Sequence, residues 1–227
     1  HLLSRRQRQM CIRDSFPCKL LIATSNWLKM NHSATANEII EVTQEELSRA
    51  SLQKTPQEVL AVFVQPSYDL NPEVIKSSLC LALDDVQDPG NLGTIIRLAD
   101  WFGIEHIFCS TGTADVYNPK TVQATMGALA RVKVHYCSLP QLIESLTDIP
   151  VYGTFLNGNI IYTESLSAHG LIVMGNEGKG VSLEVEKLIN NKLYIPNYPQ
   201  ERETSESLNV AIATAVVCSE FRRRLLP

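Results

Sequence analysis

The sequence has no long apolar run, no secretory signal pattern and no cysteines at metal-ligand spacing. In its 227 residues, no hydrophobic stretch reaches the roughly 18–20 residues that a membrane-spanning helix needs, so we expect no membrane association. The six cysteines stand at positions 11, 18, 80, 109, 137 and 218, several of them inside apolar segments. Free buried thiols are typical of a reducing compartment, which predicts a cytoplasmic protein.

Several catalytic patterns are also missing. There is no Gly-x-Ser-x-Gly elbow of a serine hydrolase, and the histidines at 32, 106, 135 and 169 fit no metal spacing, so no metal site is expected. The dinucleotide fingerprint Gly-x-Gly-x-x-Gly is absent, which disfavours a Rossmann oxidoreductase.

Positive charge is scarce as well. The formal net charge is −4, whereas a small nucleic-acid-binding module normally carries a positive excess. Any RNA binding would therefore depend on local groups of cations. The candidates are Arg97, Lys120, Arg131, Lys133, Lys179, Arg202 and the run Arg222, Arg223 and Arg224.

The chain is expected to divide into three parts. Residues 1–15 contain Arg-Gln-Met-Cys-Ile-Arg-Asp, which resembles translated sequencing-adapter sequence, and are predicted to be non-native. Residues 16–70 read as a small α/β piece followed by a turn-rich linker, with Thr43 and Glu46 spaced as a helix capping box. Residues 71–227 form the larger domain.

The larger domain alternates strands and helices, which predicts an α/β fold with a mostly parallel sheet covered on both faces. Strands are expected at 79–84, 105–110, 131–136, 151–156, 171–175 and 192–195. Helices are expected at 92–102, 119–128, 139–147, 182–190 and 206–224.

Polar clusters stand at several of these strand-to-helix junctions, where open α/β sheets bind ligands. The first is Asp88-Pro89-Gly90-Asn91-Leu92-Gly93-Thr94-Ile95-Ile96-Arg97, in which Asn91 is expected to cap a helix that begins near Leu92. The second is Met174-Gly175-Asn176-Glu177-Gly178-Lys179-Gly180. The third is Glu206-Ser207-Leu208-Asn209-Val210-Ala211-Ile212-Ala213, in which Leu208 is expected to begin the last helix.

In this order, the clusters resemble the motifs Asn-x-Gly-x-x-x-Arg, Gly-x-Glu-Gly-x-Gly and Ser-Leu-Asn-Val of the SpoU (TrmH-like) RNA 2′-O-ribose methyltransferases. The resemblance covers residues 79–224. It implies a C-terminal trefoil knot of the SPOUT type, S-adenosylmethionine as cofactor, rRNA or tRNA as substrate, and a homodimer formed through the knot region. It also implies that residues 16–70 are a truncated RNA-substrate-binding domain. One departure is the segment between Pro196 and Ser207, which is longer than the family pattern.

The resemblance assigns site residues by motif position. Those implied in catalysis are Asn91, Arg97, Glu177, Ser207 and Asn209, with Glu177 orienting Arg97. Those implied in cofactor binding are Thr154, Phe155, Leu156, Gly175, Asn176, Gly178, Ile195, Pro196 and Leu208. The resemblance implies that Arg97 helps to deprotonate the ribose 2′-hydroxyl. A free guanidinium is a poor base, because its pKa lies above about 12. The alternative role is that Arg97 holds the adjacent phosphate and stabilises the developing alkoxide.

Two other functions stay open from sequence alone. A catalytically silent RNA-binding module of the same fold would keep these segments without transferring a methyl group. A dinucleotide-dependent enzyme remains the weaker alternative, because an acidic residue such as Glu177 inside a glycine loop would repel a phosphate.

Overall fold

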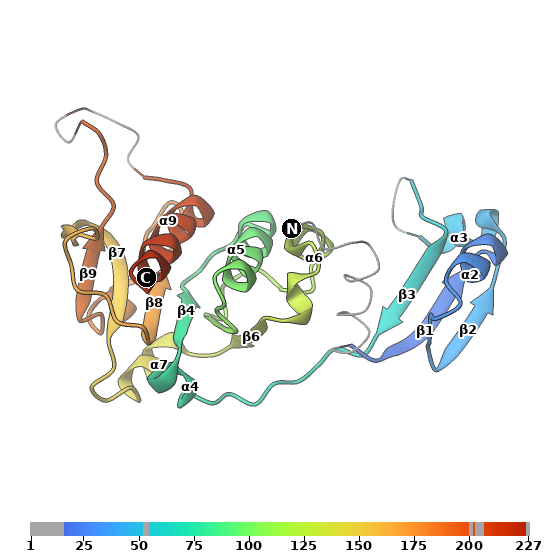
Figure 1. Ribbon diagram of the computed structural model, residues 1–227, viewed down its shortest axis with the longest axis horizontal. Helices are drawn as coiled ribbons and strands as arrows, with labels where there is room; N and C mark the ends of the chain where they lie inside the picture. Colours follow the sequence, from blue (N-terminus) through green and yellow to red (C-terminus); the bar gives the residue numbers. More distant parts are fainter. Residues whose placement is uncertain (1–15, 52–54, 200–201, 203–206, 226–227) are drawn as a thin grey trace. The chain divides into compact units, whose positions relative to one another are not determined.

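The computed structural model describes residues 16–51, 55–199, 202 and 207–225. The segment 1–15, predicted to be non-native, lies outside these residues, as does most of the long segment before Ser207. The chain divides into two compact units, and the boundary falls between Ser67 and Tyr68 (Figure 1). Each unit is described by itself.

The first unit is a small three-stranded sheet of order β2-β1-β3 with short helices. Strands β1 (Cys18–Ala23) and β2 (Glu38–Glu41) are parallel, and β3 (Val59–Phe63) is antiparallel to β1. Helices α2 (Ser25–Met30) and α3 (Gln44–Ala50) follow β1 and β2. The predicted capping box is confirmed, since Thr43 accepts from the Glu46 N–H while the Glu46 carboxylate accepts from the Thr43 N–H.

The second unit is a six-stranded sheet of order β6-β5-β4-β8-β7-β9, in which every neighbouring pair is parallel. The strands are β4 (Leu79–Leu83), β5 (His106–Cys109), β6 (Lys133–Tyr136), β7 (Val151–Ile160), β8 (Gly170–Met174) and β9 (Asn191–Tyr194). The expectation of an α/β fold with a mostly parallel sheet is therefore confirmed.

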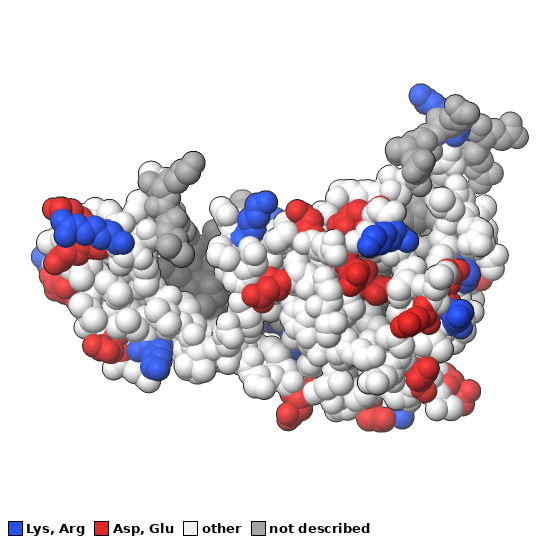
Figure 2. Space-filling view, turned by 180° about the vertical axis from the view of Figure 1, so that it is seen from behind, with Lys and Arg blue, Asp and Glu red and all other residues white. Residues whose placement is uncertain are grey.

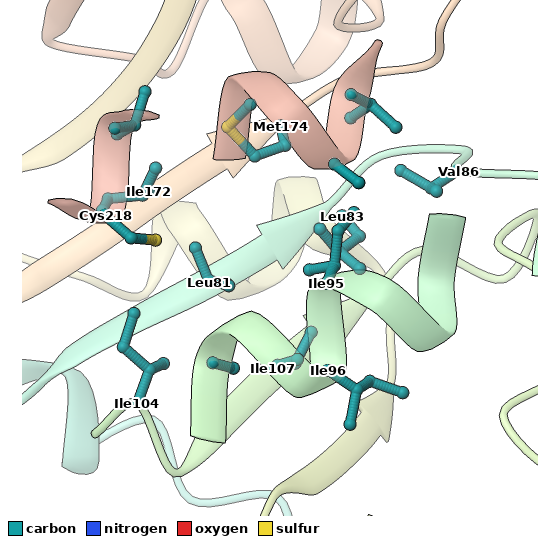
Figure 3. Close-up of a cluster of buried hydrophobic side chains, with 14 of the residues drawn as sticks. Leu81, Leu83, Val86, Ile95, Ile96, Ile104, Ile107, Ile172, Met174 and Cys218 are labelled. Atoms are coloured by element: carbon teal, nitrogen blue, oxygen red, sulfur yellow. The ribbon is translucent and has the colours of Figure 1, made fainter. Parts of the chain in front are cut away.

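Helices cover both faces of this sheet because the central strands are apolar on both sides. Along β4, Leu81 and Leu83 point into a core shared with α5 (Pro89–Trp101) and α9 (Val210–Arg223), where Ile95 and Cys218 are also buried (Figure 3). The alternate β4 residue, Ala82, points into a second core. That core is formed with α4 (Val74–Ser77), α7 (Leu139–Glu144) and α8 (Leu183–Glu186). The remaining helices are α6 (Pro119–Thr125) and the 3₁₀ turn η1 (Ala128–Ala130).

Two predicted helix starts are wrong. Helix α5 begins at Pro89 instead of Leu92, because Asp88 is its N-cap and accepts from the Asn91 N–H; Asn91 therefore lies inside the first turn. Helix α9 begins at Val210, because the Asn209 side chain caps it by accepting from the Ala211 and Ile212 N–H groups. Leu208 thus precedes the helix.

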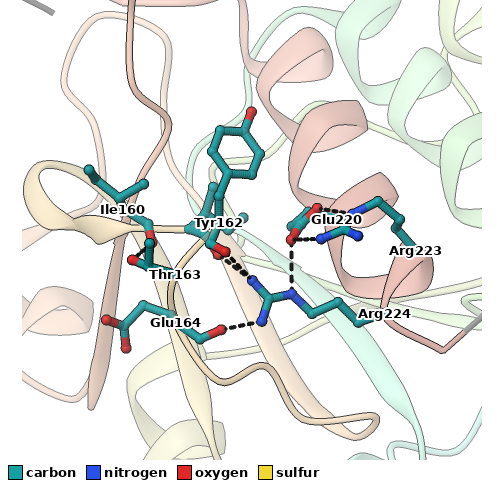
Figure 4. Close-up of polar contacts among 8 residues, drawn as sticks. Ile160, Tyr162, Thr163, Glu164, Glu220, Arg223 and Arg224 are labelled. Atoms are coloured by element: carbon teal, nitrogen blue, oxygen red, sulfur yellow. Dashed lines mark hydrogen bonds and ion pairs between the residues drawn. The ribbon is translucent and has the colours of Figure 1, made fainter.

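Helix α9 is anchored at its C-terminal end by its own arginines. The Arg224 guanidinium donates to the backbone carbonyls of Ile161, Tyr162 and Glu164, and also pairs with Glu220 (Figure 4). Arg223 pairs with the same carboxylate. Neighbouring Arg222 donates to the carbonyls of Phe102 and Gly103 at the end of α5. Arg222, Arg223 and Arg224, considered above as RNA contacts, therefore serve the fold.

Candidate functional site

A cavity of about 540 Å³ opens at the carboxyl end of β8, which is where parallel sheets place their ligand sites. Its walls come from β7, the loop after β8, the end of α8, the end of β9 and the start of α9. The volume lies within the range of small-molecule and cofactor sites.

The loop after β8 is a tight hairpin that glycine makes possible. Asn176 and Gly180 exchange backbone hydrogen bonds of 2.9 Å in each direction. A Cβ on Gly175 would lie 2.3 Å from the carbonyl carbon of Gly180, so no larger residue fits there. Gly180 has φ +70°, a conformation that glycine adopts without strain. The glycines thus serve a close backbone approach.

The Asn176 side chain shapes the same loop from within. Its Oδ1 accepts from the N–H groups of Gly178 (2.9 Å) and Lys179 (3.0 Å). Its Nδ2 donates to the carbonyl of Asp85 at 2.8 Å. Because these bonds use the side-chain amide and the hairpin bonds use the backbone, Asn176 mainly fixes the shape of the loop.

Residues from each of the polar segments meet beside this loop. The Asn209 Nδ2 group donates to Asn91 Oδ1 at 3.0 Å, and the Asn91 Nδ2 group donates to Glu177 Oε1 at 2.7 Å. The bonds join the N-cap of α9, the first turn of α5 and the loop after β8. Glu177 itself lines the cavity, so the chain of amides ends on a carboxylate at its wall.

Arg97 lies apart from this chain. It is exposed on α5, outside the residues that line the cavity. Within the described part of the chain, its guanidinium has no hydrogen bond or ion pair, and Glu177 is bonded to Asn91 instead. The structure therefore does not bring Glu177 and Arg97 together as the sequence analysis expected.

Most of the other predicted residues do gather at the cavity. Those implied in cofactor binding that line it are Thr154, Phe155, Leu156, Gly175, Asn176, Gly178, Ile195 and Leu208. Ser207 and Glu177, implied in catalysis, line it as well. Pro196 is not among the lining residues, although it follows Ile195 directly.

Sequence reasoning missed a charged wall of the cavity. Glu186 lines it and forms an ion pair with Lys192, whose ammonium lies 4.7 Å from the centre of the Phe155 ring. Glu186 is on α8 and Lys192 on β9, and neither belongs to a glycine-rich or capping motif. In the sequence they are single charged residues in a helix and an edge strand. Such residues are common on solvated surfaces, so they do not reveal a site.

The cavity therefore combines apolar walls with carboxylates and without a metal cluster. Leu156 and Leu208 are apolar and largely exposed at its wall, at 76% and 49%. Glu177 adds negative charge, whereas Glu186 is paired with Lys192, and Lys179 also lines the cavity. Among the described residues, no group of His, Cys, Asp or Glu is arranged to hold a metal ion. Such a site suits a small molecule that has both apolar and charged groups.

Comparison with known proteins adds independent information. The model of the SpoU rRNA Methylase family matches residues 78–219. RlmP of Bacillus subtilis, named as a 23S rRNA (guanosine(2553)-2′-O)-methyltransferase, is 34% identical over 184 residues, which make up 80% of this chain and 71% of RlmP. Two further curated relatives are matched over 66% and 62% of their own length, so the chain spans about two thirds of the relatives it matches.

Solved structures share the fold over nearly the whole chain. A Porphyromonas gingivalis protein of the TrmH family is 38% identical, with a TM-score of 0.82 over 99% of this chain and 100% of that one. An AdoMet-bound rRNA methyltransferase from Sinorhizobium meliloti is 28% identical, with a TM-score of 0.80 over 97% of this chain and 85% of that one.

Proposed function

The chain belongs to the SpoU rRNA methylase family, and on that premise we propose that it transfers a methyl group from S-adenosylmethionine to a ribose 2′-hydroxyl of RNA. The observation that carries the proposal is the hydrogen-bonded chain Asn209–Asn91–Glu177 at the cavity. It joins segments that are far apart in sequence and that match the family's motifs. A merely structural cap at each helix would not need these side chains to meet.

The cavity fits S-adenosylmethionine by its chemistry. Apolar groups of Phe155, Leu156 and Leu208 would hold the adenine, and the carboxylate of Glu177 would face the positive charge of the methionine end. When bound, the cofactor supplies a methyl group on a sulfonium, which is a good leaving group. The protein is then left mainly with alignment of the acceptor oxygen, which can itself contribute several kcal/mol.

Arg97 is proposed to act on the RNA side. Its exposed guanidinium is available to hold a phosphate next to the target ribose and to stabilise negative charge that develops on the 2′-oxygen. Asn91 and Asn209, linked to each other, hold Glu177 at the cavity wall. In this arrangement Glu177 serves the cofactor, while Arg97 serves the acceptor.

The RNA class follows from the relatives. RlmP is named for 23S rRNA and the Sinorhizobium protein as an rRNA methyltransferase, so ribosomal RNA is the substrate to test first and transfer RNA the second. Residues 16–70 are proposed to contribute to RNA recognition as a substrate-binding α/β domain with its linker. The cations on the face shown in Figure 2 form small separate groups among acidic and neutral side chains, which favours modest RNA affinity.

The knot and the homodimer are proposed on the position of α9. Strand β9 is at the sheet edge, yet α9 packs on α5, which follows β4 near the sheet centre. A knotted return of the C-terminal segment would connect these places. Large apolar side chains are exposed on α5 and α9 and at the C-cap of α6, namely Trp101 (76%), Ile212 (55%) and Met126 (50%). A second copy would cover them, and sedimentation analysis of Trp101→Glu tests this.

We also propose that the enzyme is located in the cytoplasm, together with its RNA substrate. The described cysteines are all free thiols, as expected in a reducing compartment. Among the described residues, no helix has the length and apolar character needed to cross a bilayer.

The proposal is tested by methyl transfer from labelled S-adenosylmethionine to unmodified ribosomal and transfer RNA, with mapping of the labelled ribose. Arg97→Ala should lose transfer by about 100-fold or more while cofactor affinity, measured by calorimetry, stays unchanged. The matched control is Lys76→Ala, an exposed cation on α4. RNA binding without any transfer would favour the catalytically silent module instead. Absence of cofactor binding would defeat both the cofactor assignment and the reaction.

A further inference from the structure

Two adjacent acidic residues directly after strand β4 contact the segment after β8, residues 175–182, which the proposed function assigns to cofactor binding and which is called the cofactor loop below. Asp84 is only 5% exposed, and its Oδ2 accepts from the Ser182 N–H at 2.7 Å. Ser182 ends the loop and is the N-cap of α8. The buried carboxylate of Asp84 thus holds the far end of the loop.

Asp85 holds the near end through its backbone. It has φ +58°, a left-handed conformation that is unusual for a residue other than glycine. This turn aims its carbonyl at Asn176, whose Nδ2 donates to it at 2.8 Å. Asn176 in turn holds the N–H groups of Gly178 and Lys179. The loop conformation therefore depends on how Asp85 is turned.

The turn at Asp85 is stabilised by the segment that directly follows strand β5. The Asp85 N–H donates to Ser110 Oγ at 2.9 Å, and the Ser110 hydroxyl donates back to Asp85 Oδ1 at 3.1 Å. The carboxylate also packs closely on Gly112, where an added Cβ would lie 2.0 Å from Asp85 Oδ1. Together, these contacts compensate the strain of the left-handed conformation.

We propose that Asp84 and Asp85 are positioning residues for the cofactor loop, acting through Ser182 and Asn176. The inference rests on the proposed function, since it assigns the loop to cofactor binding. With both ends held, the loop keeps the conformation that forms the cavity wall. If either end is released, only a fraction of molecules is competent, and the apparent dissociation constant of the cofactor rises by the inverse of that fraction.

This role predicts a specific kinetic signature. Weakened cofactor affinity should raise the KM for S-adenosylmethionine, while kcat at saturating cofactor and affinity for RNA stay near their original values. Residues that only support the fold would instead lower the unfolding temperature without separating these quantities.

The variants are Asp85→Ala, Asp85→Asn and Asp84→Ala in the full chain. Alanine is disfavoured at positive φ and cannot accept from Ser110, whereas asparagine tolerates this conformation and keeps an acceptor oxygen. The matched control is Asp148→Ala. Asp148 also has a left-handed conformation, φ +59°, but is exposed between α7 and β7 and contacts no part of the loop.

Measurements are calorimetry with S-adenosylmethionine, the KM and kcat of methyl transfer, and hydrogen–deuterium exchange of residues 175–182. We expect Asp85→Ala and Asp84→Ala to weaken cofactor binding about tenfold or more, and to speed exchange in the loop. Asp85→Asn and Asp148→Ala should stay within about threefold of the original chain.

Other outcomes would overturn the inference. Unchanged cofactor affinity in folded Asp84→Ala and Asp85→Ala would do so, as would equal weakening in Asp148→Ala. If Asp84→Ala does not fold, Ser110→Ala tests the same loop more gently and should also speed its exchange. If the unaltered chain fails to bind cofactor, the proposed function fails and this inference with it. If the unaltered chain binds cofactor and the variants bind it equally well, the inference alone fails.

Discussion

The side-chain amide of Asn91 donates to Glu177 Oε1 across 2.7 Å, although the residues are 86 positions apart in the chain. Asn91 also accepts from Asn209, which caps α9. One amide thus connects the first turn of α5 with the loop after β8 and with the last helix. Its N–H group donates and its oxygen accepts, so both ends of the Asn91 amide have a partner that requires an asparagine-like side chain.

Asn91→Ala should reduce methyl transfer strongly. The change removes the donor to Glu177 and the acceptor for Asn209, and we expect a loss on the order of 100-fold in kcat/KM. The free energy of unfolding should fall by only about 1–2 kcal/mol, because these groups remain partly accessible to water. Asn118→Ala is the matched control, since it removes a capping bond to the Lys120 N–H outside the cavity. An active, folded Asn91→Ala protein would remove this amide from the site.

Gly175→Ala and Gly178→Ala form a matched pair within one loop. A Cβ on Gly175 would lie 2.3 Å from backbone of Gly180, whereas on Gly178 it would meet nothing closer than Asn176 Oδ1 at 3.7 Å. Gly175→Ala should therefore distort the loop and abolish cofactor binding, whereas Gly178→Ala should leave the loop backbone in place and weaken binding much less. Calorimetry on both proteins decides the matter, and equal affinities would show that the loop is not closely packed.

Because of Glu220, the free energy of unfolding should depend on pH. Its hydrogen bonds to Arg223 and Arg224 lower its pKa from 4.5 to about 2. A lowered carboxyl pKa contributes stability above the unfolded value, and this contribution is lost as the pH falls from about 4.5 to about 2. Glu220→Gln should therefore be less stable than the original chain at pH 6, with the difference shrinking below pH 4.5. Thermal unfolding across this range measures it. The control is Glu144→Gln on the exposed side of α7, measured over the same pH range.

The imidazoles of His106 and His135 should add a second pH dependence. They lie on neighbouring strands with 3.1 Å between His106 Nδ1 and His135 Nε2, and Lys133 and Glu105 are the charged groups beside them. Burial, then His106, then Lys133 lower the pKa of His135 from 6.5 to about 4.

The sign follows from proton uptake. Between about pH 6.5 and 4 the unfolded chain binds a proton at His135 that the folded chain does not, so stability falls as the pH falls through this window. His135→Phe should reduce this slope, and urea unfolding at several pH values measures it. An unchanged slope would mean that His135 is protonated in the folded protein over the same range.

Much of the fold could be predicted because its signals are local. Every strand of the large sheet was expected close to its observed place, since runs such as Leu79–Leu83 are apolar at every position. The capping box at Thr43 depends on residues only three positions apart, and it was predicted correctly. Helix starts were less certain, because Asp88 and Asn91 are both good caps and only the folded backbone selects between them.

The sequence by itself determined the α/β class, the order of the elements and the polar segments that end near one another, because periodicity and turn chemistry act over a few residues. Tertiary structure decided which polar groups meet. It paired Asn91 with Glu177, left Arg97 exposed and engaged Arg224 with backbone carbonyls. It also brought Asp84 and Asp85 into contact with the segment that follows β8. These partners depend on the packing of distant segments, and no local pattern in the chain encodes the distances between them.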